Sequence, residues 1–232
     1  QMFRKTIVLS SPIVLGMYAF PSIAFNAEQW PFDTKGMPTK IVPKIESVPK
    51  ASPLSLAGVG MRRKNLYITE VDVYLVGINM SNTALQSAKE WNACHKNEGS
   101  LVDYLMKSRS QKLASEVIAS ATLRFCRSVT KDQFLTAFDE AFKGCTPEAV
   151  AEFRKVMGDS MSAGTVNKNE ELVLFWLDNG DIAFSLNGVF AESRLTNFEL
   201  NKRLLEVYID PTRTVSKELY NCLESNIGNV AV

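Results

Sequence analysis

The sequence predicts a single α+β domain, and three observations support this fold class. Residues 66–78 form an apolar run rich in Val, Ile and Tyr, which is typical of a strand. Residues 171–190 contain two apolar runs around Asn179-Gly180, the pattern of a β-hairpin. Segments with helical spacing lie between these regions and after them. Strands near both ends of a domain, with helices between and after, indicate an α+β fold.

Composition and charge narrow the function classes. Of the 232 residues, 46% are hydrophobic and 22% are charged, as in an ordinary globular protein. The net charge is +1 and no long basic run occurs, so we do not expect nucleic-acid binding. With a single histidine, His95, and no CxxC pair among Cys94, Cys126, Cys145 and Cys222, we expect no metal site and no cofactor. Nothing in the sequence selects a pairing of the four cysteines.

Residues 1–27 are predicted to be a targeting segment. Arg4 and Lys5 form a basic start, and residues 7–24 are mostly apolar, which is the layout of a secretory signal. The apolar run is short and broken by proline, so we expect no stable membrane span in the mature protein; a retained anchor is the alternative. Residues 18–21 resemble the cleavage site of algal plastid precursors. The compartment therefore stays open between secreted or periplasmic and plastid stroma.

The next segment is predicted to lie outside the folded core. Residues 28–45 contain several prolines and few apolar side chains, so they indicate a linker or a peripheral arm, and the domain is expected to cover residues 46–232. Gly58 and Gly60 permit a tight turn or a close backbone approach ahead of the strand at 66–78. Apolar residues occupy both the odd and the even positions of that strand, which predicts that both of its faces are buried.

The middle of the chain alternates between helical and strand patterns. Residues 81–97 predict a helix, residues 101–119 predict one amphipathic helix or two short ones, and residues 121–129 predict a half-buried strand. Thr130, with Gln133 three residues on, has the spacing of a capping box at a helix start.

Two helices and a hairpin are predicted to follow. Phe134, Phe138 and Phe142 lie on one stripe of a helix that Gly144 ends, and Thr146-Pro147 begins the second helix. After the hairpin come a second turn, a helix that a proline stops, and a last helix. They are expected at Asn187-Gly188, at residues 198–208 with Asp210-Pro211 behind them, and at residues 215–226.

The order of these motifs resembles the chalcone isomerase-like family over roughly residues 46–232. The resemblance rests on residues 58–62 (GVGMR), 73–77 (VYLVG), 124–129 (RFCRSV), the helix at 134–142, the turn at 187–188 and the helix at 197–205. It implies a large antiparallel sheet packed against a layer of helices, with an apolar ligand cleft between them. The family includes isomerases that close a flavanone ring and non-catalytic members that bind fatty acids.

The resemblance also implies site residues. Arg62 takes the position of the family's cleft arginine, and Tyr74 takes a position that is threonine in the isomerases and commonly tyrosine in the fatty-acid binders. Phe134, Ala137 and Ala141 replace a tyrosine, a lysine and an asparagine of the isomerase site. Asn201 falls where a serine or threonine lines the cleft. The arginine is thus retained, while most of the other polar groups of the isomerase site are apolar here.

We therefore expect a non-catalytic binding or carrier protein for a fatty acid or similar apolar carboxylate. Arg62 and Tyr74 would hold the head group, because a guanidinium offers a planar fork that fits a carboxylate, and Phe134 and Asn201 would line the cleft. One alternative is a chalcone-flavanone isomerase-type intramolecular lyase that uses Arg62. Another is a structural or interaction module that keeps the fold and has no ligand. Arg62 itself could instead be a solvated arginine in a loop beside Arg63 and Lys64, or pair with an internal acid. Ligand chain length and oligomeric state stay open.

Overall fold

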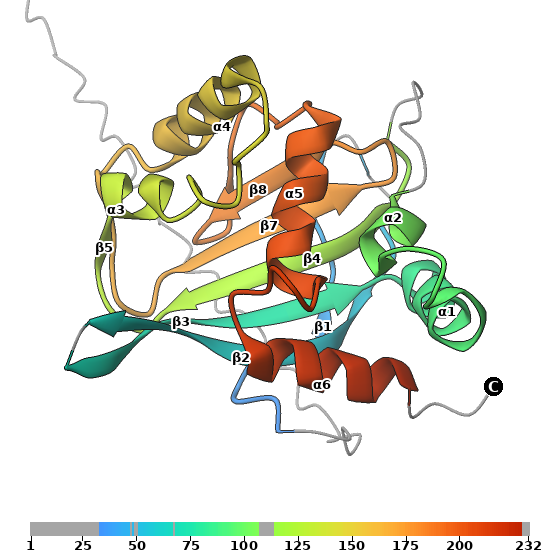
Figure 1. Cartoon of the computed structure of the whole chain (residues 1–232). Helices are drawn as coiled ribbons and strands as arrows, with labels where there is room; N and C mark the ends of the chain where they lie inside the picture. Colours follow the sequence, from blue (N-terminus) through green and yellow to red (C-terminus); the bar gives the residue numbers. More distant parts are fainter. Residues whose placement is uncertain (1–32, 47, 49–50, 67, 107–113, 229–232) are drawn as a thin grey trace, which may run out of the picture. The chain divides into compact units, whose positions relative to one another are not determined.

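The computed structural model describes residues 33–228 except 47, 49–50, 67 and 107–113 (Figure 1). A seven-stranded antiparallel sheet in the order β1-β2-β3-β4-β7-β8-β9 forms its centre. Its strands are β1 (Lys40–Ile41), β2 (Leu54–Leu66), β3 (Thr69–Met80), β4 (Val117–Phe125), β7 (Glu171–Leu177), β8 (Ile182–Leu186) and β9 (Val189–Phe190). Strands β5 (Val129–Thr130) and β6 (Thr165–Val166) pair separately. The targeting segment predicted at 1–27 lies outside the described residues.

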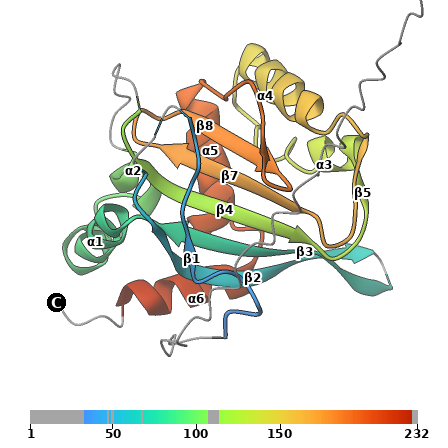
Figure 2. The ribbon, with the colours of Figure 1, turned by 180° about the vertical axis from the view of Figure 1, so that it is seen from behind.

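Helices cover one face of the sheet. They are α1 (Asn82–Glu90), a π-helical turn η1 (Trp91–His95), α2 (Leu101–Leu105), α3 (Lys131–Thr136), α4 (Pro147–Ser160), α5 (Phe198–Ile209) and α6 (Lys217–Gly228). In Figure 1, α5 and α6 lie in front of the sheet, and from behind, in Figure 2, the sheet lies in front of them. The structure thus confirms the predicted α+β class with a large antiparallel sheet and a helix layer.

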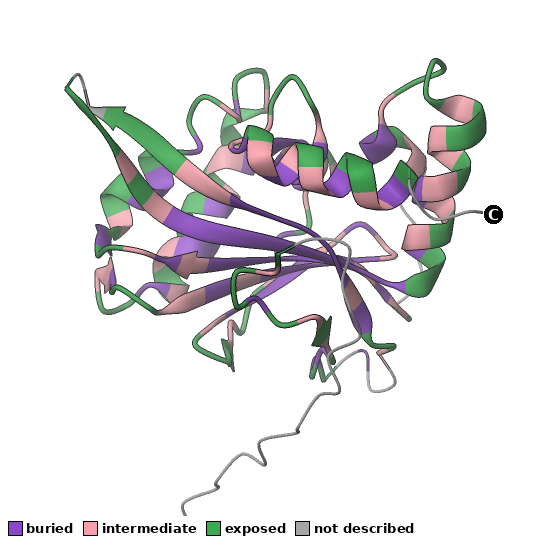
Figure 3. Ribbon diagram, turned by 90° about the horizontal axis from the view of Figure 1, so that it is seen from below, coloured by how far each residue is buried: buried purple, intermediate pink, exposed green. Residues whose placement is uncertain are grey.

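The core lies between this helix layer and the sheet. Its largest fully buried side chains include Trp176, Tyr208, Phe125, Phe153 and Phe184. In Figure 3 the inner parts of the strands are buried, whereas the far end of the β2–β3 hairpin is exposed. The hairpin therefore extends beyond the packed core at one end of the sheet.

The β2–β3 hairpin differs from the single strand that was expected at 66–78. β2 and β3 pair from Ser55↔Met80 to Leu66↔Thr69, so Gly58 and Gly60 lie inside a long strand rather than in a loop. Sequence periodicity missed β2 because glycine has low strand propensity and no side chain to show alternation. A tertiary contact with α6 compensates for this weakness.

That contact is the close approach that the two glycines were predicted to permit. A Cβ atom on Gly60 would lie 2.3 Å from the backbone nitrogen of Leu219 and 2.7 Å from Ser216 Oγ. A Cβ on Gly58 would lie 3.1 Å from Leu223 Cβ. Helix α6 therefore rests directly on the backbone of β2, and only glycine fits at position 60 without moving the helix.

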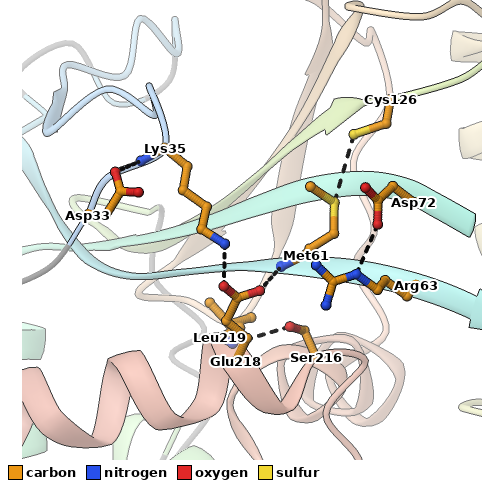
Figure 4. A network of polar contacts seen from close by, with 9 residues as sticks. All are labelled: Asp33, Lys35, Met61, Arg63, Asp72, Cys126, Ser216, Glu218 and Leu219. Atoms are coloured by element: carbon orange, nitrogen blue, oxygen red, sulfur yellow. Dashed lines mark hydrogen bonds and ion pairs between the residues drawn. The ribbon is translucent and has the colours of Figure 1, made fainter. Parts of the chain in front are cut away.

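Polar contacts fix the start of α6 on the same strand (Figure 4). Ser216 Oγ accepts a hydrogen bond from the Leu219 N–H at 3.2 Å, in the first turn of the helix. The Glu218 carboxylate accepts from the Met61 backbone N–H at 3.1 Å and pairs with Lys35, which holds the pKa of Glu218 below its usual value. The residues around Met61 are thus held between the N-terminal arm and α6.

The described part of the predicted arm packs on the domain. β1 pairs with β2, and the side chains of Met37 and Ile45 are only 3% and 5% exposed. The folded unit therefore begins before the expected boundary at residue 46. The arm has few apolar residues, as the sequence indicates; Met37 and Ile45 are buried against the sheet, whereas Val42 is 59% exposed.

The predicted helix at 101–119 is wrong at its C-terminal end. β4 already begins at Val117, where Val117 pairs with Leu177 and Ala119 pairs with Met80 and Trp176. Short apolar runs fit a helix and a strand equally well in sequence, and here pairing on both edges decides for the strand. Similarly, the helix expected to run through Phe142 ends at Thr136 and continues as turns.

Most other elements match their predictions. The capping box is present, with 3.2 Å hydrogen bonds in both directions between Thr130 and Gln133. Gly144 ends its turn with a φ of 90°, and Asn187 and Gly188 form the second turn with positive φ. The β7–β8 hairpin, α5 and α6 lie within a few residues of the predicted bounds. These local signals depend on neighbouring residues, so the sequence contains them.

Gly60→Ala tests the contact between α6 and β2. We expect a loss of about 1–3 kcal/mol in the free energy of unfolding, because the new methyl group meets helix backbone that must shift. Urea denaturation measures this change. Gly99→Ala is the matched control, since a Cβ there has no atom within 4 Å. Equal stability of both variants would contradict the close approach.

Candidate ligand-binding site

A large cleft opens between the β2–β3 hairpin, the end of β4, α3 and the segment that precedes α6. Its volume is about 840 Å³. Apolar side chains supply much of its wall: Val71, Val73, Phe125, Val129, Phe134 and Phe138. The lining also contains Arg62 and Tyr74, the two residues expected to hold a head group. The structure therefore brings three of the four predicted site residues, Arg62, Tyr74 and Phe134, to one cavity.

Strand pairing sets the arrangement of the head-group residues. Arg62 pairs with Tyr74, and Tyr74 pairs with Phe125, so the three residues form a row across β2, β3 and β4. Paired residues point to the same face of a sheet with Cβ atoms roughly 5 Å apart. The Tyr74 and Phe125 rings meet edge to face with centroids 5.8 Å apart. The guanidinium, the phenol and the phenyl ring thus lie side by side on the cleft.

A register shift between β2 and β3 widens this row. Arg62 pairs with Tyr74 but Arg63 pairs with Asp72, so Val73 is the extra residue of a β-bulge. Val73 and Tyr74 are consecutive, yet both line the cleft. A regular strand would send one of them to the opposite face. The bulge therefore adds an apolar side chain beside the polar head-group residues.

Arg62 is half-buried and has no acidic partner among the described residues. Its Nη1 donates a hydrogen bond to the Val215 carbonyl at 3.2 Å, which orients the guanidinium. The remaining N–H donors are left for water or a ligand. The contact with Val215 depends on α6, because Val215 lies just before the helix that docks on Gly58 and Gly60. The loop position considered for Arg62 is wrong, since Arg62 lies in β2.

Two tyrosine hydroxyls lie near Arg62. Burial raises the pKa of Tyr74 to about 12, and the Arg62 guanidinium opposes part of this rise. Burial also raises the pKa of Tyr208 well above its usual value, and the neighbouring Tyr74 hydroxyl adds to the rise. The Tyr208 hydroxyl is buried and has no partner among the described residues at hydrogen-bond distance and angle. Both phenols are therefore neutral at physiological pH and are potential donors.

Aromatic rings continue the wall away from Arg62. Phe134 lies 6.3 Å from Phe125 and 5.2 Å from Phe138, measured between ring centroids. Ala137 and Ala141 also line the cleft, and their small side chains leave it open beside these rings. Phe134, Ala137 and Ala141, which the resemblance places at polar positions of the isomerases, therefore contribute an apolar surface here.

Asn201 does not line the cleft. Its side-chain Nδ2 donates to the carbonyls of Gly180 and Leu195 at 2.8 and 2.9 Å, and its backbone carbonyl accepts from the Trp176 indole N–H at 2.9 Å. It is fully buried and joins α5 to the turn after β7. The expectation that Asn201 contacts a ligand is therefore wrong in its geometry: the face of α5 that carries it is turned toward the sheet.

Sequence reasoning missed several residues at the site. Cleft-lining residues that were missed are Lys64, Arg127 and residues 212–215. Tyr208 adjoins Tyr74 but does not line the cleft. Tyr208 could have been identified from the sequence, because it carries a hydroxyl among the otherwise apolar residues of α5. No local pattern identifies the others. Strand register brings Lys64 and Arg127 to the cleft, and the docking of α6 brings residues 212–215 there.

A second, smaller cavity of about 240 Å³ lies between η1, α2 and α6. Trp91, Tyr220 and Leu223 are among its lining residues, and Lys96 pairs with Glu224 at 2.7 Å. Its one cation is therefore already paired, and Asp210 adds a second acidic side chain to the lining. Among the described residues, this cavity offers no free cation to an anionic head group. No helix among the described residues is long and apolar enough to cross a membrane, and no group of three His, Cys, Asp or Glu side chains there could hold a metal ion.

The comparisons with known proteins support the fold. No protein-family model and no curated protein sequence matches the chain. Among solved structures, a fatty-acid binding protein of Arabidopsis thaliana is similar, with a TM-score of 0.58 and 16% sequence identity. The match covers 81% of this chain and 97% of that one. At this identity the likeness concerns the fold, and the chain therefore adopts the chalcone isomerase-like fold that the order of its motifs predicts.

Proposed function

We propose that this protein is a non-catalytic carrier of a fatty acid or a similar apolar carboxylate. One observation supports the proposal above all: Arg62, without an acidic partner among the described residues, lies beside neutral Tyr74 in a cleft that has an apolar wall. A half-buried guanidinium favours an anion, and its planar fork fits a carboxylate with two hydrogen bonds. The Tyr74 hydroxyl would donate a further hydrogen bond to the same head group.

The cleft also suits an apolar tail. A volume of about 840 Å³ lies within the usual range of small-molecule sites. Each buried methylene contributes about 0.8 kcal/mol, so a dozen contribute roughly 10 kcal/mol, from which the cost of lost freedom on binding must be subtracted. With the head-group hydrogen bonds added, we expect binding in the micromolar range. The similar fold of a protein named for fatty-acid binding supports a binding role in general.

Arg62→Gln tests the head-group contact. We expect the affinity for dodecanoate to fall roughly 10- to 100-fold, since a charge-assisted hydrogen bond is worth about 1.5–3 kcal/mol. Isothermal titration calorimetry with the full chain measures the change. Arg63→Gln is the matched control: Arg63 is the next residue of β2, but it pairs with Asp72 at 2.9 Å and does not line the cleft.

The two variants separate the proposal from its rivals. Equal affinity of both variants for dodecanoate would refute the role of Arg62. A wild-type protein that binds no fatty acid at all would favour the structural module. Dodecanol, which has the same chain and no charge, should bind both variants alike, because the loss concerns the carboxylate alone.

The neutrality of Tyr74 predicts a pH effect on stability. Its pKa rises from 10.0 to about 12 on folding, so the folded state holds the proton more tightly. This contribution is complete below about pH 10 and is lost as the pH rises through 12, for a total of about 3 kcal/mol. Urea denaturation at about pH 8 and pH 11.5 should show a smaller decline for Tyr74→Phe than for the wild type. An equal decline in the stability of both proteins would indicate that the Tyr74 hydroxyl is exposed to solvent.

A cyclising lyase is the second candidate, and one observation favours it. Arg62 and the neutral Tyr74 hydroxyl could stabilise a phenolate or enolate that forms during ring closure. The apolar lining at Phe134, Ala137 and Ala141 argues against it, because these positions supply no polar contact to substrate or water. We expect no acceleration of naringenin chalcone cyclisation, followed by absorbance. A rapid reaction that Arg62→Gln abolishes and Arg63→Gln preserves would establish the lyase instead.

A further inference from the structure

The charges along the cleft are strongly unbalanced. Its lining contains five cationic side chains and one acidic side chain, a net charge of +4, whereas the whole chain has a net charge of +1. The cations are Arg62, Lys64, Arg127, Lys143 and Arg213, and the acid is Glu140. Positive charge is therefore concentrated at this one site. A single carboxylate head group would neutralise only a quarter of it.

Ion pairs account for two of the five cations. Lys143 pairs with Glu140 at 2.8 Å, and Arg213 pairs with Glu206 at 3.3 Å. Arg62, Lys64 and Arg127 have no acidic partner among the described residues. The unpaired charge thus belongs to three particular side chains rather than to the cleft as a whole.

The three unpaired cations lie at the hairpin end of the cleft. Arg62 and Lys64 are two residues apart on β2, which corresponds to roughly 7 Å along a strand. The Cys126 N–H donates to the Val73 carbonyl at 3.0 Å, and this bond holds Arg127 next to β3. Lys64 of β2 pairs with Val71 of β3. Arg127 and Lys64 are therefore anchored on either side of the Val71 and Val73 part of β3.

This arrangement matches a head group with more than one negative charge. A phosphate monoester carries about −1.5 to −2 charges at neutral pH and has three strong acceptor oxygens. It can accept hydrogen bonds from a guanidinium and an ammonium group at the same time, whereas a carboxylate has two oxygens and one charge. The larger charge also relieves more of the repulsion among the three cations.

We propose that the preferred ligand of this cleft is an amphiphile with a phosphate monoester head group. Arg62, Lys64 and Arg127 bind the phosphate, and the apolar chain lies against Phe134 and Phe138. The inference rests on the proposed role of the cleft as a site for an anionic amphiphile. It changes the class of head group from a carboxylate to a phosphate.

Dodecyl phosphate and dodecanoate, titrated calorimetrically below their micelle concentrations, test the preference. At about pH 7.5 and low salt, we expect dodecyl phosphate to bind the full chain at least about tenfold more tightly. The preference should shrink near pH 5.5, where most of the phosphate carries a single charge while most of the carboxylate is still ionised. Equal affinities at both pH values would overturn the inference and leave fatty-acid binding intact. Failure of both ligands to bind would overturn the proposed function as well.

Variants that remove one or two positive charges test which side chains bind the phosphate. The double variant Lys64→Gln/Arg127→Gln should lose roughly tenfold or more in affinity for dodecyl phosphate and no more than about twofold for dodecanoate. Lys143→Gln is the matched control, because it removes one cation from the same cleft, but one that Glu140 already pairs. All three of these side chains are exposed, so the fold should tolerate the changes. An equal loss of affinity for dodecyl phosphate in Lys143→Gln would indicate a general electrostatic attraction rather than a phosphate site.

A phosphate group could also belong to a membrane surface, and sedimentation distinguishes the two sources. Phosphatidylcholine vesicles with and without phosphatidic acid serve as the probe. We expect one soluble dodecyl phosphate per protein, and competition by dodecanoate, whether or not vesicles are present. Sedimentation with phosphatidic acid vesicles, without uptake of soluble dodecyl phosphate, would assign these cations to a bilayer surface and overturn the inference.

Discussion

The contact between α6 and the backbone of β2 is the constraint on which the cleft depends. Gly58 and Gly60 let the helix approach to a distance that no other residue at position 60 tolerates. The helix in turn holds the preceding loop over β2, where the Val215 carbonyl orients Arg62. The glycines therefore affect the shape of a cleft that they do not line. Their effect is to fix the position of a wall.

The polar groups of the cleft are incompletely satisfied by the protein itself. Arg62 has a carbonyl contact but no counter-ion among the described residues, and Lys64 and Arg127 have no acidic partner there. Buried or half-buried polar groups without partners are costly, and they commonly mark binding sites. An occupant that supplies negative charge would lower that cost. The same side of the sheet offers apolar rings, so the proposed ligand is one with a single charged end.

The bulge in β3 explains how charged and apolar side chains share one short stretch of sheet. Without it, strict alternation would place Val73 and Tyr74 on opposite faces. With it, both face the cleft, and Arg63 remains on the outside with Asp72. Two neighbouring arginines thus have different environments, one lining the cleft and one paired in solvent. This difference arises from the register of the hairpin.

The sequence by itself determined the elements that depend on near neighbours. Local chemistry accounts for the capping box at Thr130, the turn at Asn187-Gly188 and helix α5. The resemblance in motif order predicted the fold and the placement of Arg62, Tyr74 and Phe134 in one cleft. Only the tertiary structure decided that Gly58 and Gly60 lie in a strand, that Asn201 faces the β7–β8 turn, and that Lys64 and Arg127 share the cleft. These features depend on strand register and helix docking. Both are set by contacts between residues far apart in the chain, which local patterns do not encode.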